Sequence, residues 1–533
     1  MQLVAYGAQD VYLTGNPQIT FWKVTYRRHT NFAMESIEQT FNGQADFGRR
    51  VTCTISRNGD LAYRTYLQVT LPEISSDNAK YARWLDCPGE QLVQQVEVEI
   101  GGQRIDRQYG DWMHIWNQLT LTSEQARGYN KMIGNTTQLT YITDPEFEAI
   151  DGPCATDAAP NQVCAPRKAL PETTLYVPLQ FWFCRNPGLA VPLIALQYHE
   201  VKINIDLRSI DECLWAVDHM NDSDTAANTD HKADKAFNKS VVAASLYVDY
   251  VFLDTDERRR MAQNPHEYLI EQLQFTGDES VGSSSNKIKL NFNHPCKELL
   301  WVVQPDAHVN YCESMRGNRD LYKLLGAQPF NYTDALDVLP NAVHAFGGPS
   351  AISDFVDGNM LGDAAAADVA AHGAGAAAAA AAGMAGTHPS VHPSFLGGAV
   401  ASGVSDAGTF VLAETALDMH CWGSNPVVTA KLMLNGQDRF SEREGTYFDL
   451  VQPYQHHTRN PDTGINCYSF ALRPEEHQPS GSCNFSRIDN ATLQLVLSHN
   501  TVAGNDTAKV RVYATNYNVL RVMSGMGGLA YSN

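Results

Sequence analysis

Cysteine is scarce in this chain, and its spacing follows no known framework. There are 11 cysteines in 533 residues, an odd number, and no C-x-x-C pair occurs. This usage excludes a disulfide framework and a zinc ribbon, and it favours reduced thiols. Cys154 and Cys164 flank a proline-containing loop and could meet, so the sequence leaves this one pairing open.

Long apolar runs and an excess of positive charge are also missing. The most apolar stretches, 175–183 and 189–196, are shorter than the ~18–20 residues that a membrane-spanning helix needs. The first ten residues lack the basic and apolar segments of a secretory signal. We therefore expect neither a signal peptide nor a transmembrane helix. The net charge of −20 repels phosphate polymers, which argues against direct nucleic-acid binding.

Motifs for nucleotide binding and hydrolysis are absent or incomplete. The glycine-rich string at 525–530 has only three residues after it, so no helix follows that could receive a pyrophosphate. No phosphate-binding loop and no G-x-S-x-G elbow occurs. His199-Glu200 and His266-Glu267 each lack the second histidine of a zinc protease.

The remaining histidine pairs do not predict a metal centre. His456 and His457 would point to opposite faces of a strand, and His388 and His392 lie in a proline-rich loop. We interpret them as solvated or hydrogen-bonded loop histidines. The acidic segment 218–224 lacks the glycine and the spacing of an EF-hand. The sequence thus predicts no catalytic, cofactor-binding or metal-binding residues, no cofactor and no enzyme.

Strand signals dominate what is present. Several segments alternate apolar and polar residues with a period of two and are separated by Gly, Asn and Pro turns. They are 50–55, 66–71, 96–100, 201–207 and 287–292. Convincing amphipathic helices are few. The pattern predicts an all-β protein built from sandwiches or jelly rolls.

The strand pattern repeats along the chain. Segments in the first half recur in the same order in the second, with offsets that vary because loops of different length separate them. The pairs are 37–43 with 270–277, 96–103 with 430–437, 201–207 with 491–497, and 246–251 with 510–515. We predict an N-terminal arm at 1–26, a first domain at 27–258, a linker at 259–264, a second domain at 265–523 and a tail at 524–533.

Insertions interrupt both predicted domains. The composition of 120–172 and of 218–239 indicates exposed loops, and the largest insertion spans about 331–413. The last contains the Ala/Gly run Ala364–Gly386, which we expect to be an outward loop whose deletion leaves thermal stability and assembly intact.

Aromatic and basic clusters have simple structural interpretations. In a β protein of this size, Phe181-Trp182-Phe183 and the Trp112/Trp116 pair are expected in the core rather than on a sugar-binding platform. Arg258-Arg259-Arg260 and Arg27-Arg28-His29 lie at the predicted domain ends, and we expect them to form surface or inter-domain ion pairs.

Beside these features, nearly the whole chain resembles one family, the double jelly-roll major capsid proteins of nucleocytoplasmic large double-stranded DNA viruses, such as those of irido-, phycodna- and mimivirus-like agents. The segments that carry the resemblance are 2–10, 20–33, 92–119, 178–205, 434–440, 465–481 and 513–521. The insert at 364–393 departs from a typical family loop.

The resemblance implies a function as well as a fold. Each half would be an eight-stranded jelly roll, and three chains would form a pseudo-hexagonal capsomer that tiles an icosahedral shell. Expected partners are two further copies, neighbouring capsomers, minor capsid and penton proteins, and inner-membrane-associated viral proteins. The expected location is the virion, with assembly inside the infected cell, in its cytoplasm. The alternative from the residues alone is a two-domain β-sandwich carbohydrate-binding protein or glycosidase, which would need a pair of carboxylates.

Overall fold

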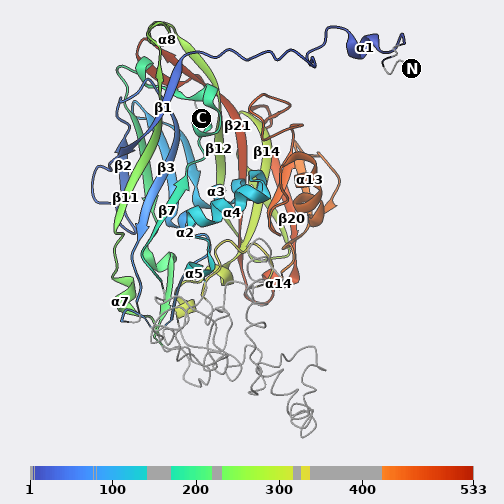
Figure 1. Ribbon diagram of the computed structural model, residues 1–533. Coiled ribbons are helices and arrows are strands. Elements are labelled where there is room, and N and C mark those ends of the chain that lie inside the picture. Colours follow the sequence, from blue (N-terminus) through green and yellow to red (C-terminus); the bar gives the residue numbers. More distant parts are fainter. Residues whose placement is uncertain are drawn as a thin grey trace.

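The computed structural model describes residues 4, 7–75, 77–79, 81–140, 170–218, 231–315, 326–335 and 423–531. The insert at 364–393, the Cys154/Cys164 pair, and most of the predicted loops at 120–172 and 218–239 lie outside these residues. Figure 1 shows two sets of upright strands side by side, with an extended N-terminal segment that leaves the body of the molecule.

The first half of the chain forms two main antiparallel sheets, each built on a row of four strands. One has the order β1-β11-β3-β7 and the other β2-β9-β5-β6. The strands are β1 (Phe32–Gln39), β2 (Arg50–Thr54), β3 (Leu61–Leu71), β5 (Val93–Ile100), β6 (Gln103–Tyr109), β7 (Thr173–Pro178), β9 (Val201–Leu207) and β11 (Ala243–Leu253). Shorter strands β4 (Tyr81–Trp84) and β10 (Leu214–Val217) pair with each other, and β8 (Val191–Pro192) pairs with β3.

The second half repeats this topology. Its sheets have the orders β12-β21-β14-β18 and β13-β20-β15-β16. The strands are β12 (His266–Val281), β13 (Ser285–Leu290), β14 (Pro295–Pro305), β15 (Val427–Leu434), β16 (Gln437–Asp438), β18 (Asn466–Ser469), β20 (Ala491–Leu497) and β21 (Ala508–Met523). Accessory strands are β17 (Arg443–Glu444), β19 (Cys483–Asn484) and β22 (Met526–Leu529). The four repeated segments read from the sequence therefore occupy matching positions in two eight-stranded jelly rolls, roll 1 and roll 2.

Short helices connect the strands. The α-helices are α1 (Val11–Thr14), α2 (Pro88–Leu92), α3 (Gly110–Thr120), α4 (Ser123–Ile133), α5 (Thr137–Thr140), α6 (Trp182–Arg185), α7 (Asp234–Phe237), α8 (Thr255–Gln263), α13 (Gln452–His456) and α14 (His499–Val502). Single turns of 3₁₀ helix are η2 (Pro187–Leu189), η3 (Leu193–Ala195), η4 (Ile210–Glu212), η5 (Asp306–Val309), η6 (Glu313–Met315) and η10 (Phe485–Arg487), and η9 (Tyr447–Val451) is a π-helix. In the described part of the chain, no helix combines the length and apolar character needed to cross a membrane.

The start of the predicted 120–172 loop is helical, so that part of the prediction is wrong. Helix α4 begins with a capping box, in which the Thr122 side chain accepts a hydrogen bond from the Gln125 backbone and the Gln125 side chain bonds back. Tyr129 and Ile133 on this helix are buried. The apolar side chains of α4 recur with the helical period of 3.6 residues, but the loop-like composition of the surrounding sequence hid this pattern.

Each roll has its own apolar core between its two sheets. The predicted core aromatics Phe181, Trp182 and Phe183 are buried in roll 1, and Trp301 anchors the core of roll 2. Arg258 pairs with Asp60 at 3.0 Å, as expected for a surface ion pair at the end of a domain. Trp112 and Trp116 are also buried, but they belong to a third cluster between the rolls.

Candidate functional site

The third apolar cluster joins the two rolls. Helix α3 of roll 1 lies across the outer face of the β12-β21-β14-β18 sheet, and Figure 1 shows it between the two sets of strands. Trp112, Ile115, Trp116 and Leu119 recur at helical spacing and pack on that face. The opposing side chains, all buried, include Leu300, Val302, Cys467 and Tyr513.

The first residue of α3 explains how the helix can start so close to roll 1. A Cβ added to Gly110 would lie 2.2 Å from the Val93 carbonyl oxygen and 2.4 Å from the Glu90 carbonyl oxygen. These are backbone atoms and cannot move aside cheaply. Glycine at this position therefore lets the chain turn directly from β6 into a helix that reaches the second roll.

A partly buried arginine on roll 2 forms ion pairs that link the two rolls. The Arg511 guanidinium, on β21, lies 2.7 Å from an Asp111 oxygen on α3 and 2.9 Å from an Asp278 oxygen on β12. Arg208 adds a second positive charge 3.6 Å from Asp111. Burial disfavours the charge on Arg511, but Asp111 and the other acidic groups around it together outweigh burial and raise the pKa of Arg511 above its usual value.

A second polar group at the junction centres on Glu271 of β12. It accepts ion pairs from Lys297 of β14 at 2.7 Å and from Arg185 of roll 1 at 3.2 Å. The Arg185 guanidinium also lies 4.6 Å from the centre of the Trp116 ring, a cation–π distance. Burial lowers the pKa of Lys297, although Glu271 opposes that shift. Glu271 therefore links the two rolls, since it pairs with Lys297 of roll 2 and with Arg185 of roll 1.

Asp106, in the middle of β6, bonds the edge of β12. Its carboxylate accepts a hydrogen bond from the Leu273 backbone at 3.1 Å, and the Gln272 side chain donates to the Ile105 carbonyl beside it. Burial raises the pKa of Asp106 to about 7. The carboxylate lines a polar groove of about 470 Å³ between β6 and β12. Among the described residues lining the groove, Asp106 is the one carboxylate, so the groove does not supply the acid pair that a glycosidase needs.

We expect the Asp106→Asn protein to gain stability over wild type as the pH rises. The unfolded carboxyl loses its proton near pH 4, whereas the folded one keeps it to about pH 7. Wild-type stability therefore falls between these values, and the amide variant lacks this loss. Urea unfolding of both proteins from pH 4 to pH 8 measures the difference between their unfolding free energies. A stability difference that stays constant over that range would contradict the assignment.

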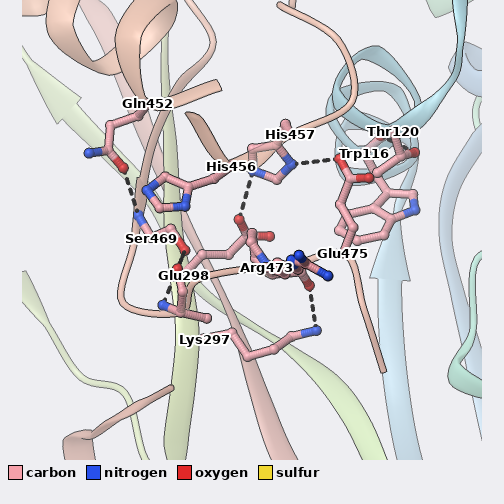
Figure 2. Close-up of polar contacts among 12 residues, drawn as sticks. Trp116, Thr120, Lys297, Glu298, Gln452, His456, His457, Ser469, Arg473 and Glu475 are labelled. Carbon is pink, nitrogen blue, oxygen red and sulfur yellow. Dashed lines mark hydrogen bonds and ion pairs between the residues drawn. The ribbon is translucent and has the colours of Figure 1, made fainter. Parts of the chain in front are cut away.

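His457 is bound between two glutamates at the end of α13. Its ring nitrogens lie 2.9 Å from Glu298 on β14 and 2.9 Å from Glu475, and Figure 2 shows the ring between them. The side chains of His457 and Glu298 are completely buried. Burial alone would lower the pKa of His457, but the charge of Glu298 and the hydrogen bonds of the ring together overcome it and raise the pKa to about 12. His457 is thus hydrogen-bonded, as expected, but it is not solvated.

His456 lies apart from this ion pair. Its ring bonds the Leu472 carbonyl oxygen at 3.1 Å, so the two adjacent histidines have different partners. His199 also bonds backbone, at Gly527 on β22, and His266 bonds the Met261 carbonyl. The structure does not bring any of these four histidines together. His388 and His392 lie outside the described residues.

One group of side chains has the composition of a metal site. Cys87, Glu90 and His114 are buried, and their donor atoms lie within 4.8 Å of one another beside a cavity of about 20 Å³. Glu90 already accepts hydrogen bonds from Tyr129 at 2.6 Å, from His114 at 2.7 Å and from Asn117. Because these bonds occupy the carboxylate oxygens a metal would need, we interpret the group as a hydrogen-bonded network.

The absence of a bound metal stays a prediction. We expect inductively coupled plasma mass spectrometry of the purified protein to find no stoichiometric zinc. We also expect a chelator to leave the melting temperature of the protein unchanged. One zinc per chain whose removal lowers the melting temperature would assign Cys87, Glu90 and His114 as ligands instead.

Sequence reasoning did not identify the junction residues Arg511 and Asp111, nor the buried Glu298 that pairs with His457. A signal for one of them was present, since Glu298 follows Lys297 within the apolar strand Cys296–Val303. Two charges inside a continuous apolar strand must be paired if both faces are covered. The partner of Glu298, His457, is 159 residues away and could not be read from the local pattern.

Two tandem jelly rolls joined through a helix-covered sheet define the class of double jelly-roll viral capsid proteins. Residues 257–528 match the family described as large eukaryotic DNA virus major capsid protein, and residues 20–254 match the major capsid protein N-terminus. The major capsid protein of Phaeocystis pouchetii virus is 75% identical over 100% of this chain and 99% of its own length. That of Paramecium bursaria Chlorella virus 1 is 40% identical with the same coverage.

A solved structure agrees with these relatives. The quasi-atomic model of the PBCV-1 virus capsid aligns with a TM-score of 0.60 and 35% identity, covering 96% of this chain and 100% of that one. The chain belongs to the family of large eukaryotic DNA virus major capsid proteins. It is a structural, non-enzymatic subunit of the virion that forms the capsid shell. The carbohydrate-enzyme alternative is therefore wrong.

Proposed function

We propose that three copies of this chain close into a pseudo-hexagonal capsomer, and that capsomers tile an icosahedral shell. The observation that carries the proposal is the repeated topology: each chain supplies two jelly rolls of the same strand order, so three chains supply six similar units. Closed rotational assemblies are the usual solution for identical subunits, and the remaining edges can bind neighbouring capsomers.

The domain division and the remaining partners are part of the same proposal. Residues 27–258 and 265–523 form the two rolls, with an arm at 1–26, a linker at 259–264 and a tail at 524–533. Helix α8 spans most of the linker, and β22 in the tail pairs with β21. The net charge of −20 supports a shell without direct nucleic-acid contact. In this proposal the shell binds minor capsid, penton and inner-membrane-associated viral proteins.

The arm supports contacts between capsomers. Residues 11–26 carry large apolar side chains that find no cover on the described part of their own chain, such as Phe21 and Trp22, which are 100% and 87% exposed. Exposed apolar groups of this size mark a surface that binds a partner. The arm of one chain binds a neighbouring capsomer in this proposal.

Native mass spectrometry and electron microscopy of the purified full chain test the capsomer. We expect a trimer and pseudo-hexagonal particles. A chain that stays monomeric over the micromolar range would overturn the proposal.

The Phe21→Ser/Trp22→Ser protein tests the arm. We expect it to keep the wild-type melting temperature and the trimer, because both side chains are exposed, and to lose assembly into larger arrays. Arrays that form normally would show that the arm does not link capsomers.

A further inference from the structure

The outer faces of the two matching sheets differ in cover. In roll 2, residues Leu300 and Tyr513 stand opposite each other on β14 and β21, and helix α3 buries both. In roll 1, the matching strands β3 and β11 place Tyr66 opposite Tyr247, and the two rings stack at 5.2 Å. Both tyrosines are partly exposed, and Tyr176 on the neighbouring strand β7 is 39% exposed. We call these three residues the tyrosine face.

The helices that match α3 differ in the same way. Helix α3 follows β6 and precedes β7, and the η9–α13 helix follows β16 and β17 and precedes β18. Whereas α3 buries its apolar residues on the next roll, the η9–α13 helix leaves Leu450, Val451 and Tyr454 exposed at 51%, 40% and 81%. Leu472, 74% exposed, lies beside its C-terminal end, where its carbonyl oxygen bonds His456. We call these four residues the helical patch.

The tyrosine face and the helical patch cannot meet within one chain. In Figure 1 the strands β11 and β3 lie at one side of the molecule and α13 lies at the other, with α3 between them. Within one chain, a helix packs on a sheet in this way once, where α3 covers the β12-β21-β14-β18 sheet. The tyrosine face belongs to the matching sheet of roll 1, and the helical patch lies on and beside the matching helix of roll 2.

We propose that the helical patch of one copy packs on the tyrosine face of the next, in the manner in which α3 packs on roll 2. The occupant is a second copy because the contact continues one that already exists between the rolls of a single chain. Such a contact is heterologous, since it uses two different patches, and it therefore builds a ring when its rotation closes. The inference rests on the proposed capsomer and names its contact surfaces.

Single substitutions on each surface test the contact. We expect Tyr454→Asp and Tyr176→Asp each to weaken trimer association more than about tenfold in native mass spectrometry, because a carboxylate would enter an apolar contact. Both side chains are exposed in the single chain, so the melting temperature of the monomer should be unchanged. Tyr531→Asp, at a residue that is 63% exposed near the end of the chain, is the matched control and should form wild-type trimers.

Cross-linking tests which surfaces touch. The background carries Cys312→Ser, which removes the exposed thiol among the described residues, and serine at the three cysteines outside them, Cys154, Cys164 and Cys421. In this background the Tyr176→Cys/Tyr454→Cys protein treated with a short bis-maleimide should give a covalent trimer. Each single cysteine variant should give none, whereas a mixture of the two should give dimers. If the wild-type protein is a trimer, but the aspartate variants associate normally and no cross-link forms, this contact is wrong and the proposed capsomer still holds. A wild-type monomer would overturn both.

Discussion

The His457→Ala protein is expected to lose about 3–5 kcal/mol of unfolding free energy. The substitution removes the positively charged partner of Glu298. The Glu298 side chain is fully buried, and its second oxygen has no hydrogen-bond partner among the described residues. Burial of a carboxylate costs desolvation free energy, and without its charged partner no ion pair offsets that cost. Equilibrium urea unfolding of the purified full chain measures the loss.

The neighbouring histidine supplies the control. His456→Ala removes a ring that bonds a backbone carbonyl and no carboxylate, so we expect a loss of less than about 1 kcal/mol. Similar losses for both variants would show that Glu298 does not depend on His457. The Glu298→Gln/His457→Gln double variant should lose less than the sum of its single variants, because it leaves no unpaired charge.

The same ion pair gives a pH dependence of defined sign. The pKa of His457 is raised to about 12 in the folded chain, while that of an unfolded histidine is about 6.5. Its stabilising contribution is complete below pH 6.5 and decreases as the pH rises toward 12, because the unfolded chain releases the proton first. Wild type should therefore lose stability from pH 7 to pH 9 more steeply than His457→Gln does.

The second large effect is expected at the junction between the rolls. Arg511→Met should cost about 3 kcal/mol, because it leaves Asp111 and Asp278 without the cation they share. Arg208, at 3.6 Å from Asp111, offsets part of the loss. Differential scanning calorimetry should show a lower melting temperature and, since the junction weakens, a broader transition.

A second arginine on the same strand is the matched control. Arg521 pairs with Glu267 at 2.8 Å, but both side chains are about half exposed, so Arg521→Met should cost less than about 1 kcal/mol. An Arg511→Met protein as stable as Arg521→Met would show that solvent, rather than Arg511, compensates Asp111.

The strands and the repeat could be read from the sequence because their signal is local. A strand with one buried face alternates every two residues, and segment 201–207 coincides with β9. The burial of Phe181 and Trp182 followed from residue type alone. Helix α4 was missed because its apolar stripe is narrow, with three buried residues in eleven.

The junction could not be read in this way. Arg511 and Asp111 are 400 residues apart, and their pairing depends on how roll 2 sits on α3. Nothing in the spacing around either residue identifies the other. The burial of Glu298 likewise results from cover supplied by segments that are distant in sequence, including the chain around His457. For a single strand considered alone, the default expectation places charged residues in solvent.

The packing of α3 on roll 2 also has a kinetic consequence for assembly. Because both rolls lie on one polypeptide, this contact forms at an effective concentration set by the chain between them and does not depend on how much protein the infected cell has made. A shell built from these chains brings together half as many freely diffusing particles as one built from separate rolls. Dilution early in infection can therefore slow only the contacts between chains.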